Sequence, residues 1–180
     1  MNDIFGRLGP LPAREHPELL AEPVARALAG QAPSAVVAAI DPQFADTEAL
    51  CAEYGIPLEA SANAVVVRGT RAGVERFAVC MTLAHRRVDV NGVVRRRLDA
   101  RKASFAPMDV AVEATGMEYG GITPVGVPQD WPVWVDAAVA EANWLCIGSG
   151  IRGSKLFLTA TDLLALPGAE RVENLARDAG

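Results

Sequence analysis

The sequence predicts a single α/β domain of the α+β type, with helices around a mixed, largely antiparallel sheet. Three observations support this fold class. Short β-branched runs and helical segments intermix along the chain, several links between expected strands have hairpin length, and 180 residues of which 51% are hydrophobic suffice for one core. A doubly wound parallel sheet would need a long crossover between paired strands, which these short links do not provide.

Two helices and a strand are expected in the first third of the chain. Apolar residues recur near helical spacing in residues 17–29, with a proline at the start and a glycine after the end. Residues 35–40 form a short β-branched run that ends at an Asp-Pro pair, which predicts a strand. Asp46 can cap a second helix over residues 46–54, and the glycine that follows fits a left-handed C-terminal cap.

A β-hairpin and a basic helix are expected next. Residues 63–68 and 75–83 are rich in β-branched and apolar side chains, and the link between them, residues 69–73, contains two glycines typical of a hairpin turn. Residues 93–102 carry five basic side chains after an Asn-Gly pair, and they predict a short basic helix.

The second half of the chain alternates short helices, strands and glycine-rich links. A proline starts and a glycine ends the helix expected over residues 107–115, and the glycine-rich link after it runs to residue 128. From residue 169 the chain is rich in charged residues, and no helix or strand is expected there. The elements expected between them are strand 131–136, helix 137–142 capped by Asp136, strands 144–147 and 154–158, and helix 161–166 capped by Thr159 or Thr161.

Composition narrows the possible function classes. No apolar run reaches the ~18 residues that a membrane-spanning helix needs, and the N-terminus lacks the basic and apolar regions of a secretory signal. Three cysteines lie far apart and form no Cys-x-x-Cys pair. We therefore expect a cytoplasmic protein that does not contact membranes, with reduced, buried thiols at Cys51, Cys80 and Cys146.

Basic residues gather in one segment of an acidic chain. Residues 86–102 hold seven basic and two acidic residues, a net charge of +5, while the whole chain has a net charge of −5. Such a local basic cluster fits a phosphate-bearing partner at one face of the protein. The alternative is a solvated surface whose arginines pair with nearby carboxylates, and charge alone does not separate the two interpretations.

Known catalytic and cofactor motifs are absent from the sequence. There is no nucleophile elbow, phosphate-binding loop or dinucleotide fingerprint, and the two histidines stand in unrelated contexts, so we expect no metal and no cofactor. Two glycine-rich loops remain, residues 120–126 and 148–153. Each is either a tight connection or a place where backbone polar groups approach a ligand. Two of them in one small domain favour a pocket built from backbone groups.

The order of these elements resembles the YbaK/EbsC family, the family of prolyl-tRNA-synthetase-associated editing domains and their free-standing relatives. The resemblance covers about residues 34–175. Its most specific part is a Gly-x-x-x-Pro loop, Gly120 to Pro124, followed by a strand ending at Asp136 and a glycine-rich turn before Arg152. It divides the chain into an N-terminal extension with one helix (1–33), an editing-like domain (34–175) and a tail (176–180).

The resemblance implies hydrolysis of the ester that joins a wrong amino acid to the 3′-terminal adenosine of a tRNA. The protein would act in trans as an aminoacyl-tRNA deacylase, a hydrolase of translation quality control, with the aminoacyl-tRNA 3′ end as its partner and no DNA partner. Water would attack the ester carbonyl with help from substrate hydroxyls. Positioning and backbone stabilisation of the oxyanion would suffice, because an ester has a fair leaving group. The choice between a monomer and a homodimer stays open.

The resemblance and the charge pattern together name the candidate site residues. Those expected at the reacting centre are Asn63, Gly120, Gly121 and Pro124. Those expected to bind the substrate are Gly148, Ser149, Gly150, Arg152 and Arg68. Those expected to contact tRNA phosphates are Arg95, Arg96, Arg97, Arg101 and Lys102.

Asn63 departs from the family pattern, which has a lysine at the start of this strand. An amide can hydrogen-bond a hydroxyl or carbonyl group but supplies no charge. Three hypotheses therefore stand: a deacylase that uses Asn63 and nearby arginines in another way, a non-catalytic protein that binds tRNA or a small aminoacyl or nucleotide ligand in the same pocket, and a protein-interaction module. Deacylation of mischarged tRNAs separates the first from the other two.

Overall fold

The largest sheet has five strands, and the long hairpin β3–β4 forms its centre. The computed structural model describes residues 4–178. β7 pairs parallel with β4 and with β10, and the other neighbours in this sheet pair antiparallel. The strands lie in the order β10 (Ala169–Val172), β7 (Val133–Asp136), β4 (Val74–Leu83), β3 (Ala62–Arg71) and β6 (Lys102–Phe105).

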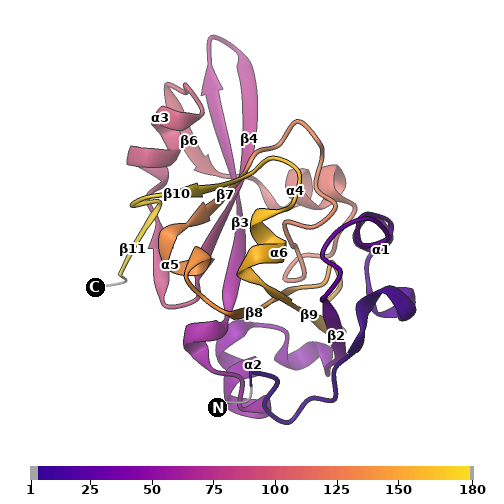
Figure 1. Cartoon of the computed structure of the whole chain (residues 1–180). Coiled ribbons are helices and arrows are strands. Elements are labelled where there is room, and N and C mark those ends of the chain that lie inside the picture. Colours follow the sequence, from indigo (N-terminus) through magenta and orange to yellow (C-terminus); the bar gives the residue numbers. More distant parts are fainter. Residues whose placement is uncertain (1–3, 179–180) are drawn as a thin grey trace.

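A second, fully antiparallel sheet lies beside the first (Figure 1). Its order is β1 (Leu11–Pro12), β2 (Val36–Ala39), β9 (Ser154–Thr159) and β8 (Trp144–Gly148). An isolated parallel bridge between Ser61 and Cys146 joins the residue before β3 to the middle of β8. The two sheets therefore meet at the start of β3.

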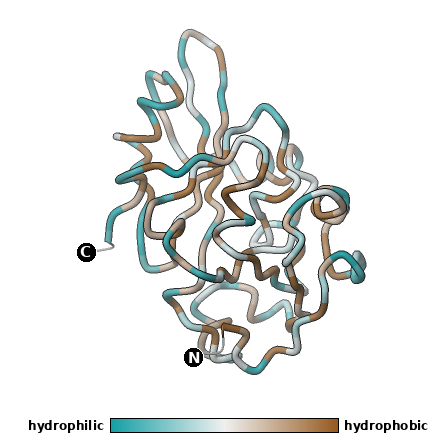
Figure 2. Tube along the Cα trace, in the orientation of Figure 1, coloured by the Kyte–Doolittle hydropathy of each residue, from teal (hydrophilic) through white to brown (hydrophobic). Residues whose placement is uncertain are grey.

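Helices cover the two sheets and enclose three hydrophobic clusters. The largest cluster lies between the sheets and includes Leu28, Val79, Leu145 and Leu158, all of them fully buried. Figure 2 shows hydrophobic residues along the central strands and hydrophilic residues at most outer turns. Burial of one such aliphatic side chain contributes about 1.5–3 kcal/mol. The helices are α1 (Glu22–Leu28), α2 (Thr47–Tyr54), α3 (Arg95–Arg97), α4 (Met108–Thr115), α5 (Ala137–Ala140) and α6 (Ala160–Leu164).

The hairpin β3–β4 is longer than the sequence predicts. Its turn is the pair Ala72 and Gly73, both at positive φ, so residues 69–71 belong to the strand and not to the link. Gly69 is needed inside β3 because a Cβ there would lie 2.7 Å from the Cβ of Ala100. The glycine expected in the turn therefore permits the link between α3 and β6 to pack closely against β3.

The helix expected over residues 17–29 is broken in the structure. A 3₁₀ turn covers Pro17–Leu19, and the α-helix begins only at Glu22. Pro23 stands in the first turn of α1, where its missing N–H leaves no hydrogen bond unmade; in the interior of one long helix it would break the backbone pattern.

The basic helix expected over residues 93–102 is also shorter. A π-helical turn, Val90–Val94, continues into α3, and Asp99 adopts a left-handed conformation that ends the helix. Lys102 then starts β6, which pairs with β3. The basic residues are thus split: three arginines form the short helix, Arg101 lies in the link that follows, and Lys102 starts an edge strand.

The C-terminal segment forms strands, so the expectation that no element follows residue 169 is wrong. β10 adds to the large sheet, and β11 (Ala176–Asp178) pairs antiparallel with β5 (Arg86–Val88). Residues 179 and 180 of the expected tail, like residues 1–3 of the expected extension, lie outside the described residues. The mixed, largely antiparallel architecture itself confirms the predicted fold class.

Candidate functional site

A pocket of about 460 Å³ opens where the two sheets meet. Its lining comes from the N-terminal end of α2, the first half of β3, the segment from β6 to α4, the loop that contains Gly120, and the strands β8 and β9. The pocket is therefore built from segments between residues 45 and 155, and it is lined by both apolar and polar groups.

Asn63, the second residue of β3, lines this pocket. Its side chain is exposed, and its Oδ1 accepts a hydrogen bond from Thr47 Oγ1 at 3.0 Å. Thr47 is the first residue of α2 and also lines the pocket. The hydrogen bond leaves the Asn63 amide nitrogen free to donate to a ligand.

The Gly-x-x-x-Pro loop contributes only part of its length to the pocket. Gly120 lines it at φ +80°, and a Cβ there would meet Arg152 Nη1 at 2.1 Å. Gly121 is buried, and its missing side chain faces the backbone of Ile151. Pro124 is buried and lines a separate hollow beside α1. The structure thus brings Gly120 together with Asn63 and places Pro124 elsewhere.

The second glycine-rich loop, between β8 and β9, supports the first one. Gly148 lines the pocket, and a Cβ on it would lie 2.4 Å from the carbonyl oxygen of Gly121. Gly150 donates its N–H to the same oxygen at 2.7 Å. Ser149 is fully buried, and its hydroxyl bonds to Ser154 within the loop. Gly150 therefore links the two loops, Ser149 fixes the second loop internally, and neither residue lines the pocket.

Arg152 clamps the rim beside Gly120. Its backbone N–H donates to Glu118 Oε2 at 2.7 Å, and its guanidinium donates to the carbonyl oxygen of Pro42 and pairs with Asp46 at 3.4 Å. Asp46 occupies the N-cap position of α2 as expected, but its side chain makes no capping bond and pairs with Arg152 instead. The arginine ties both glycine-rich loops to the start of α2.

Lys155 is a pocket residue that the sequence analysis did not single out. It lies on β9 opposite Gly148, lines the pocket and is 7% exposed. Its ammonium makes no hydrogen bond or ion pair with any described residue. Burial is the main cause that lowers its pKa, and Arg152 lowers it further, while Asp46 and Cys146 oppose the shift. The available signal was a lone lysine inside the apolar run of residues 154–158.

Burial keeps the thiols of Cys146 and Cys80 protonated at neutral pH. Burial raises the pKa of Cys146, at the floor of the pocket, to about 12, with Lys155 opposing the shift. Burial likewise raises the pKa of Cys80, which lies in β4, to about 12. Cys51, Cys80 and Cys146 are all free. Cys146 therefore supplies no negative charge to Lys155.

The residues expected to contact tRNA phosphates do not all lie together. Arg95, Arg101 and Lys102 line a second hollow, of about 600 Å³, which we call the basic hollow. Arg68, which was expected to bind the substrate, lines this hollow and not the pocket, and it pairs with Glu75 at 3.1 Å. Arg97 instead pairs with Glu170 and lies over the ring of Trp134 at 4.9 Å. The side chains of Arg96, Arg101 and Lys102 make no hydrogen bond or ion pair within residues 4–178.

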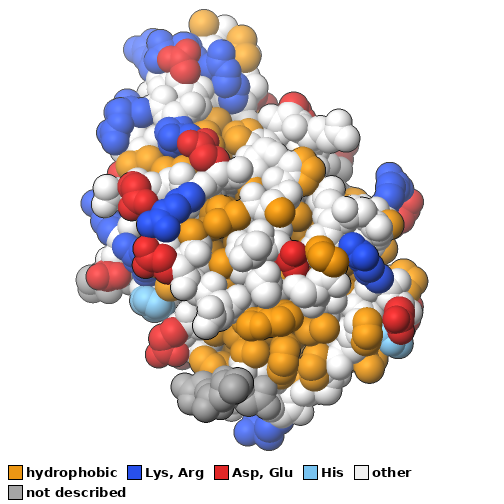
Figure 3. Space-filling view, in the orientation of Figure 1, with side chains coloured by type: hydrophobic (Ala, Val, Ile, Leu, Met, Phe, Trp, Pro, Cys, Tyr) orange, Lys and Arg blue, Asp and Glu red, His pale blue; other side chains and the backbone are white. Residues whose placement is uncertain are grey.

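β6 connects the basic hollow with the pocket. Three of its four residues, from Lys102 to Ser104, line the basic hollow, and the fourth, Phe105, lines the pocket. In Figure 3, Lys and Arg side chains gather at the end of the molecule that carries α3 and the β3–β4 hairpin, with acidic side chains among them. The two concave regions are thus neighbours along one short strand.

Exposed apolar side chains surround the mouth of the pocket. Among the described residues, six large hydrophobic side chains are exposed, and three of them line this pocket: Phe105, Met108 and Tyr119, with exposures of 64%, 53% and 59%. Such a collar of aromatic and thioether groups presents flat, polarisable surfaces to a ligand.

Comparison with known proteins identifies the family. Residues 41–166, more than two thirds of the chain, match the family described as the aminoacyl-tRNA editing domain. The chain belongs to this family. The match contains the pocket lining from Ala45 to Lys155 and all of the expected site residues.

Solved structures share the fold of this editing domain at low sequence identity. One, described as a candidate trans-editing enzyme for prolyl tRNA synthetase, is 20% identical with a TM-score of 0.73, over 88% of this chain and 97% of that one. Another, a hypothetical protein, is 17% identical with a TM-score of 0.75, over 87% and 100%. A third, described as a candidate signal transduction protein from Marinobacter aquaeolei VT8, is 19% identical with a TM-score of 0.57, over 87% of this chain and 30% of that one.

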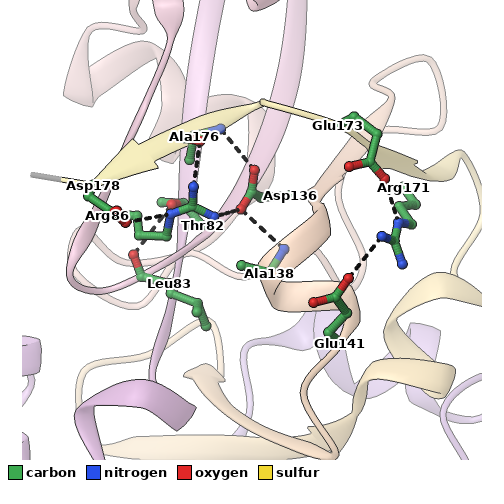
Figure 4. A network of polar contacts seen from close by, with 10 residues as sticks. All are labelled: Thr82, Leu83, Arg86, Asp136, Ala138, Glu141, Arg171, Glu173, Ala176 and Asp178. Carbon is green, nitrogen blue, oxygen red and sulfur yellow. Dashed lines mark hydrogen bonds and ion pairs between the residues drawn. The ribbon is translucent and has the colours of Figure 1, made fainter.

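Asp136, which ends β7 in this editing domain, lies outside the pocket lining and has a structural role. Its buried carboxylate accepts hydrogen bonds from the backbone of Ala138 and Ala176 and from Arg86, whose Nε lies 3.2 Å from Asp178 Oδ1 (Figure 4). The network therefore joins β7, α5, β5 and β11. Nearby, Arg171 bridges Glu141 and Glu173.

Two kinds of feature are absent from the described part of the editing domain. Residues 4–178 contain no group of three or more His, Cys, Asp or Glu side chains placed to hold a metal ion. No helix within the same range is long and apolar enough to cross a membrane.

Proposed function

We propose that this editing domain hydrolyses the ester of mischarged aminoacyl-tRNA in trans. The observation that carries the proposal is the pocket at the sheet junction, whose lining includes Asn63, Gly120 and Gly148 and which lies beside the basic hollow. Family membership supports an editing role, and the pocket volume of about 460 Å³ lies in the range of small-molecule sites.

The surroundings of the pocket fit the 3′ end of a tRNA. Single-stranded nucleic acid is commonly held by a basic groove for its phosphates and by aromatic rings on which bases stack. Here Phe105 and Tyr119 stand exposed at the pocket mouth, and Lys102 begins the same strand in the basic hollow. The terminal adenosine would stack on this rim while the preceding phosphates meet the basic hollow.

The interior of the pocket fits an acyl group and an attacking water. Leu50, Val66, Ala111 and Ile147 offer an apolar surface to the amino acid side chain, and the Asn63 amide can donate to a carbonyl or ribose oxygen. Hydrolysis of an ester needs orientation and stabilisation of a developing negative charge more than a strong base. The lining contains no histidine, so the proton of the water passes to solvent or to the ribose.

A deacylation assay tests the proposed function. Purified protein is mixed with a panel of tRNAs, each charged with a labelled wrong amino acid, and release of the amino acid is followed against buffer alone. We expect at least one charged tRNA to be hydrolysed faster than its spontaneous rate. Binding of a charged tRNA without faster release would favour the non-catalytic alternative, and neither binding nor release would favour an interaction module.

The variant Asn63→Ala links the activity to this pocket. It removes the amide that faces the ligand and one exposed hydrogen bond to Thr47, so the free energy of unfolding should change by less than about 0.5 kcal/mol while deacylation slows. Asn143→Ala removes an exposed asparagine outside the pocket lining and serves as the control. Equal turnover of the Asn63 variant and wild type on every substrate would remove Asn63 from the site.

A further inference from the structure

The pocket holds a positive charge that the protein itself does not neutralise. Lys155 is 7% exposed, and its ammonium has no hydrogen-bond or ion-pair partner among residues 4–178. Buried charged groups are normally paired, because removal of an ion from water without compensation is unfavourable. A lysine kept in this state at a pocket wall is therefore placed to meet an anionic group of a ligand.

The neighbours of Lys155 rule out an internal counter-ion. Cys146 is the nearest titratable group on β8, and its thiol stays protonated because of burial. Asp46 acts on Lys155 from the rim, but its own carboxylate is largely exposed and pairs with Arg152. The residues that flank Lys155 along β9 are the buried hydrophobic Leu156 and Phe157, and the small Ser154. None of these groups satisfies the ammonium.

The position of Lys155 relative to the loops points to the reacting centre. It pairs across the sheet with Gly148, whose missing side chain leaves space for the carbonyl groups of the Gly-x-x-x-Pro loop. It lies within electrostatic range of both Asp46 at the rim and Cys146 at the floor. A nucleoside at the exposed rim and an acyl side chain on the apolar floor would put the ester between these two levels.

We propose that Lys155 is a catalytic residue whose ammonium stabilises the oxyanion formed on the acyl carbonyl group, an inference that rests on the proposed function. Water attacks the carbonyl carbon, and the C=O π electrons move to the carbonyl oxygen, which the ammonium hydrogen-bonds. The C=O bond then re-forms as the bond to the ribose oxygen breaks. One water proton ends on that ribose oxygen and the other passes to solvent, and Lys155 keeps its proton throughout.

This assignment explains why the charge is left unpaired. The substrate ester is neutral and the tetrahedral intermediate carries one negative charge, so a preformed cation interacts more strongly with the intermediate than with the substrate. A permanent carboxylate partner would cancel that difference. The pocket thus supplies a positive charge where the proposed reaction develops a negative one.

The decisive experiment separates kcat from KM in variants of Lys155. Lys155→Met keeps most of the length of the side chain and removes its charge, and we expect kcat to fall by about 10²- to 10³-fold for every amino acid that wild type releases, with little change in KM. Lys155→Arg keeps the charge and should recover part of the rate. Lys102→Met, in the basic hollow, should change KM and leave kcat. An unchanged kcat in Lys155→Met, or a loss confined to amino acids with an oxygen-bearing side chain, would overturn the proposal.

A pH profile distinguishes the oxyanion role from a role as general base. The groups that face Lys155 are Cys146 from β8, Cys51 and Asp46 from α2 and its cap, and Arg152 from the β8–β9 loop. The ratio of the wild-type rate to the Lys155→Met rate should fall as alkali removes the ammonium proton. A ratio that rises with pH would mean that the neutral amine acts as a base, and would overturn the proposal.

A binding measurement keeps the inference testable without turnover. The probes are adenosine carrying an aminoacyl phosphonate, a tetrahedral anion, and the matching neutral amide. Wild type should bind the phosphonate at least ~10-fold more tightly than Lys155→Met does, and both should bind the amide alike. Equal phosphonate affinity overturns the role of Lys155. A wild-type protein that hydrolyses no charged tRNA contradicts the proposed function alone, and the phosphonate comparison then still decides about Lys155.

Discussion

At the scale of single residues, the pocket shows a conflict between stability and the proposed chemistry at Lys155. Its side chain is 7% exposed, its ammonium has no partner among residues 4–178, and burial lowers its pKa below the usual 10.5. A protonated lysine is therefore less favourable in the folded chain than in the unfolded chain. This penalty is complete below the folded-state pKa and vanishes as the pH rises past the pKa of the unfolded chain.

Lys155→Met should therefore make the protein more stable at neutral pH while it slows the proposed reaction. We expect the free energy of unfolding at pH 7 to rise by roughly 0.5–2 kcal/mol, as for other substitutions that remove a destabilising functional group. Because the penalty disappears with deprotonation, the gain should shrink towards pH 10.5. Urea denaturation of both proteins at several pH values measures it. A less stable variant at neutral pH would mean that the lysine has a structural role.

At the scale of elements, the two glycine-rich loops form one packed unit. Gly121 has no room for a side chain, because a Cβ would lie 2.7–2.8 Å from the backbone of Ile151. We expect Gly121→Ala to lower the free energy of unfolding by about 1–3 kcal/mol, the usual effect of overpacking. Gly153 in the second loop has open space around its Cα, so Gly153→Ala is the matched control and should change it by less than about 0.5 kcal/mol. Equal thermal stability of the two variants would contradict this packing.

The basic hollow is the second feature at this scale, and salt dependence tests it. Removal of three cations that would contact a single strand, in the triple variant Arg95→Ala, Arg101→Ala and Lys102→Ala, should reduce the slope of log affinity against log salt by roughly 2 units. The control removes the same charge from outside the hollow, with alanine at Arg7, Arg26 and Arg171. A tRNA-binding slope that changes equally in both proteins would assign the effect to net charge alone.

At the scale of the whole molecule, Asp136 ties the C-terminal strands to the central sheet (Figure 4). Its carboxylate is 1% exposed and accepts hydrogen bonds from three partners. Asp136→Ala would leave the partly buried Arg86 without this partner, and we expect a loss of about 3–5 kcal/mol in the free energy of unfolding. Exposed Asp130→Ala is the control. A small loss in the Asp136 variant, seen by urea denaturation, would show that β11 is held by other contacts.

The sequence predicts the parts of this molecule that depend on local signals. The strands around Val66, Val79, Val135 and Leu156 follow from β-branched runs, and the capping role of Asp136 follows from its place before a short helix. β6 and β11 were missed because each is short, polar and paired with a strand distant in sequence, so no periodicity marks it.

The site was predicted only in outline, for a physical reason. Asn63, Gly120 and Gly148 line one pocket because the two sheets meet there. The family resemblance predicted that these residues share a site, whereas the residue pattern alone did not. The roles of Gly121 and Ser149 in loop packing depend on contacts across the chain that spacing cannot reveal. Lys155 was missed because a lysine in a strand usually points to solvent, and only the fold places it against the pocket.

The labelling rates of the two buried thiols report how often the chain opens around each of them. A thiol reagent reacts with the deprotonated thiolate. Almost none of Cys80 or Cys146 is in this form, because burial raises the pKa of each thiol to about 12. Their labelling must therefore wait until the chain opens around them. Since Cys146 lies in the pocket floor and Cys80 lies in β4 against α3, a pocket ligand should slow the first labelling rate more than the second, unless the molecule opens all at once.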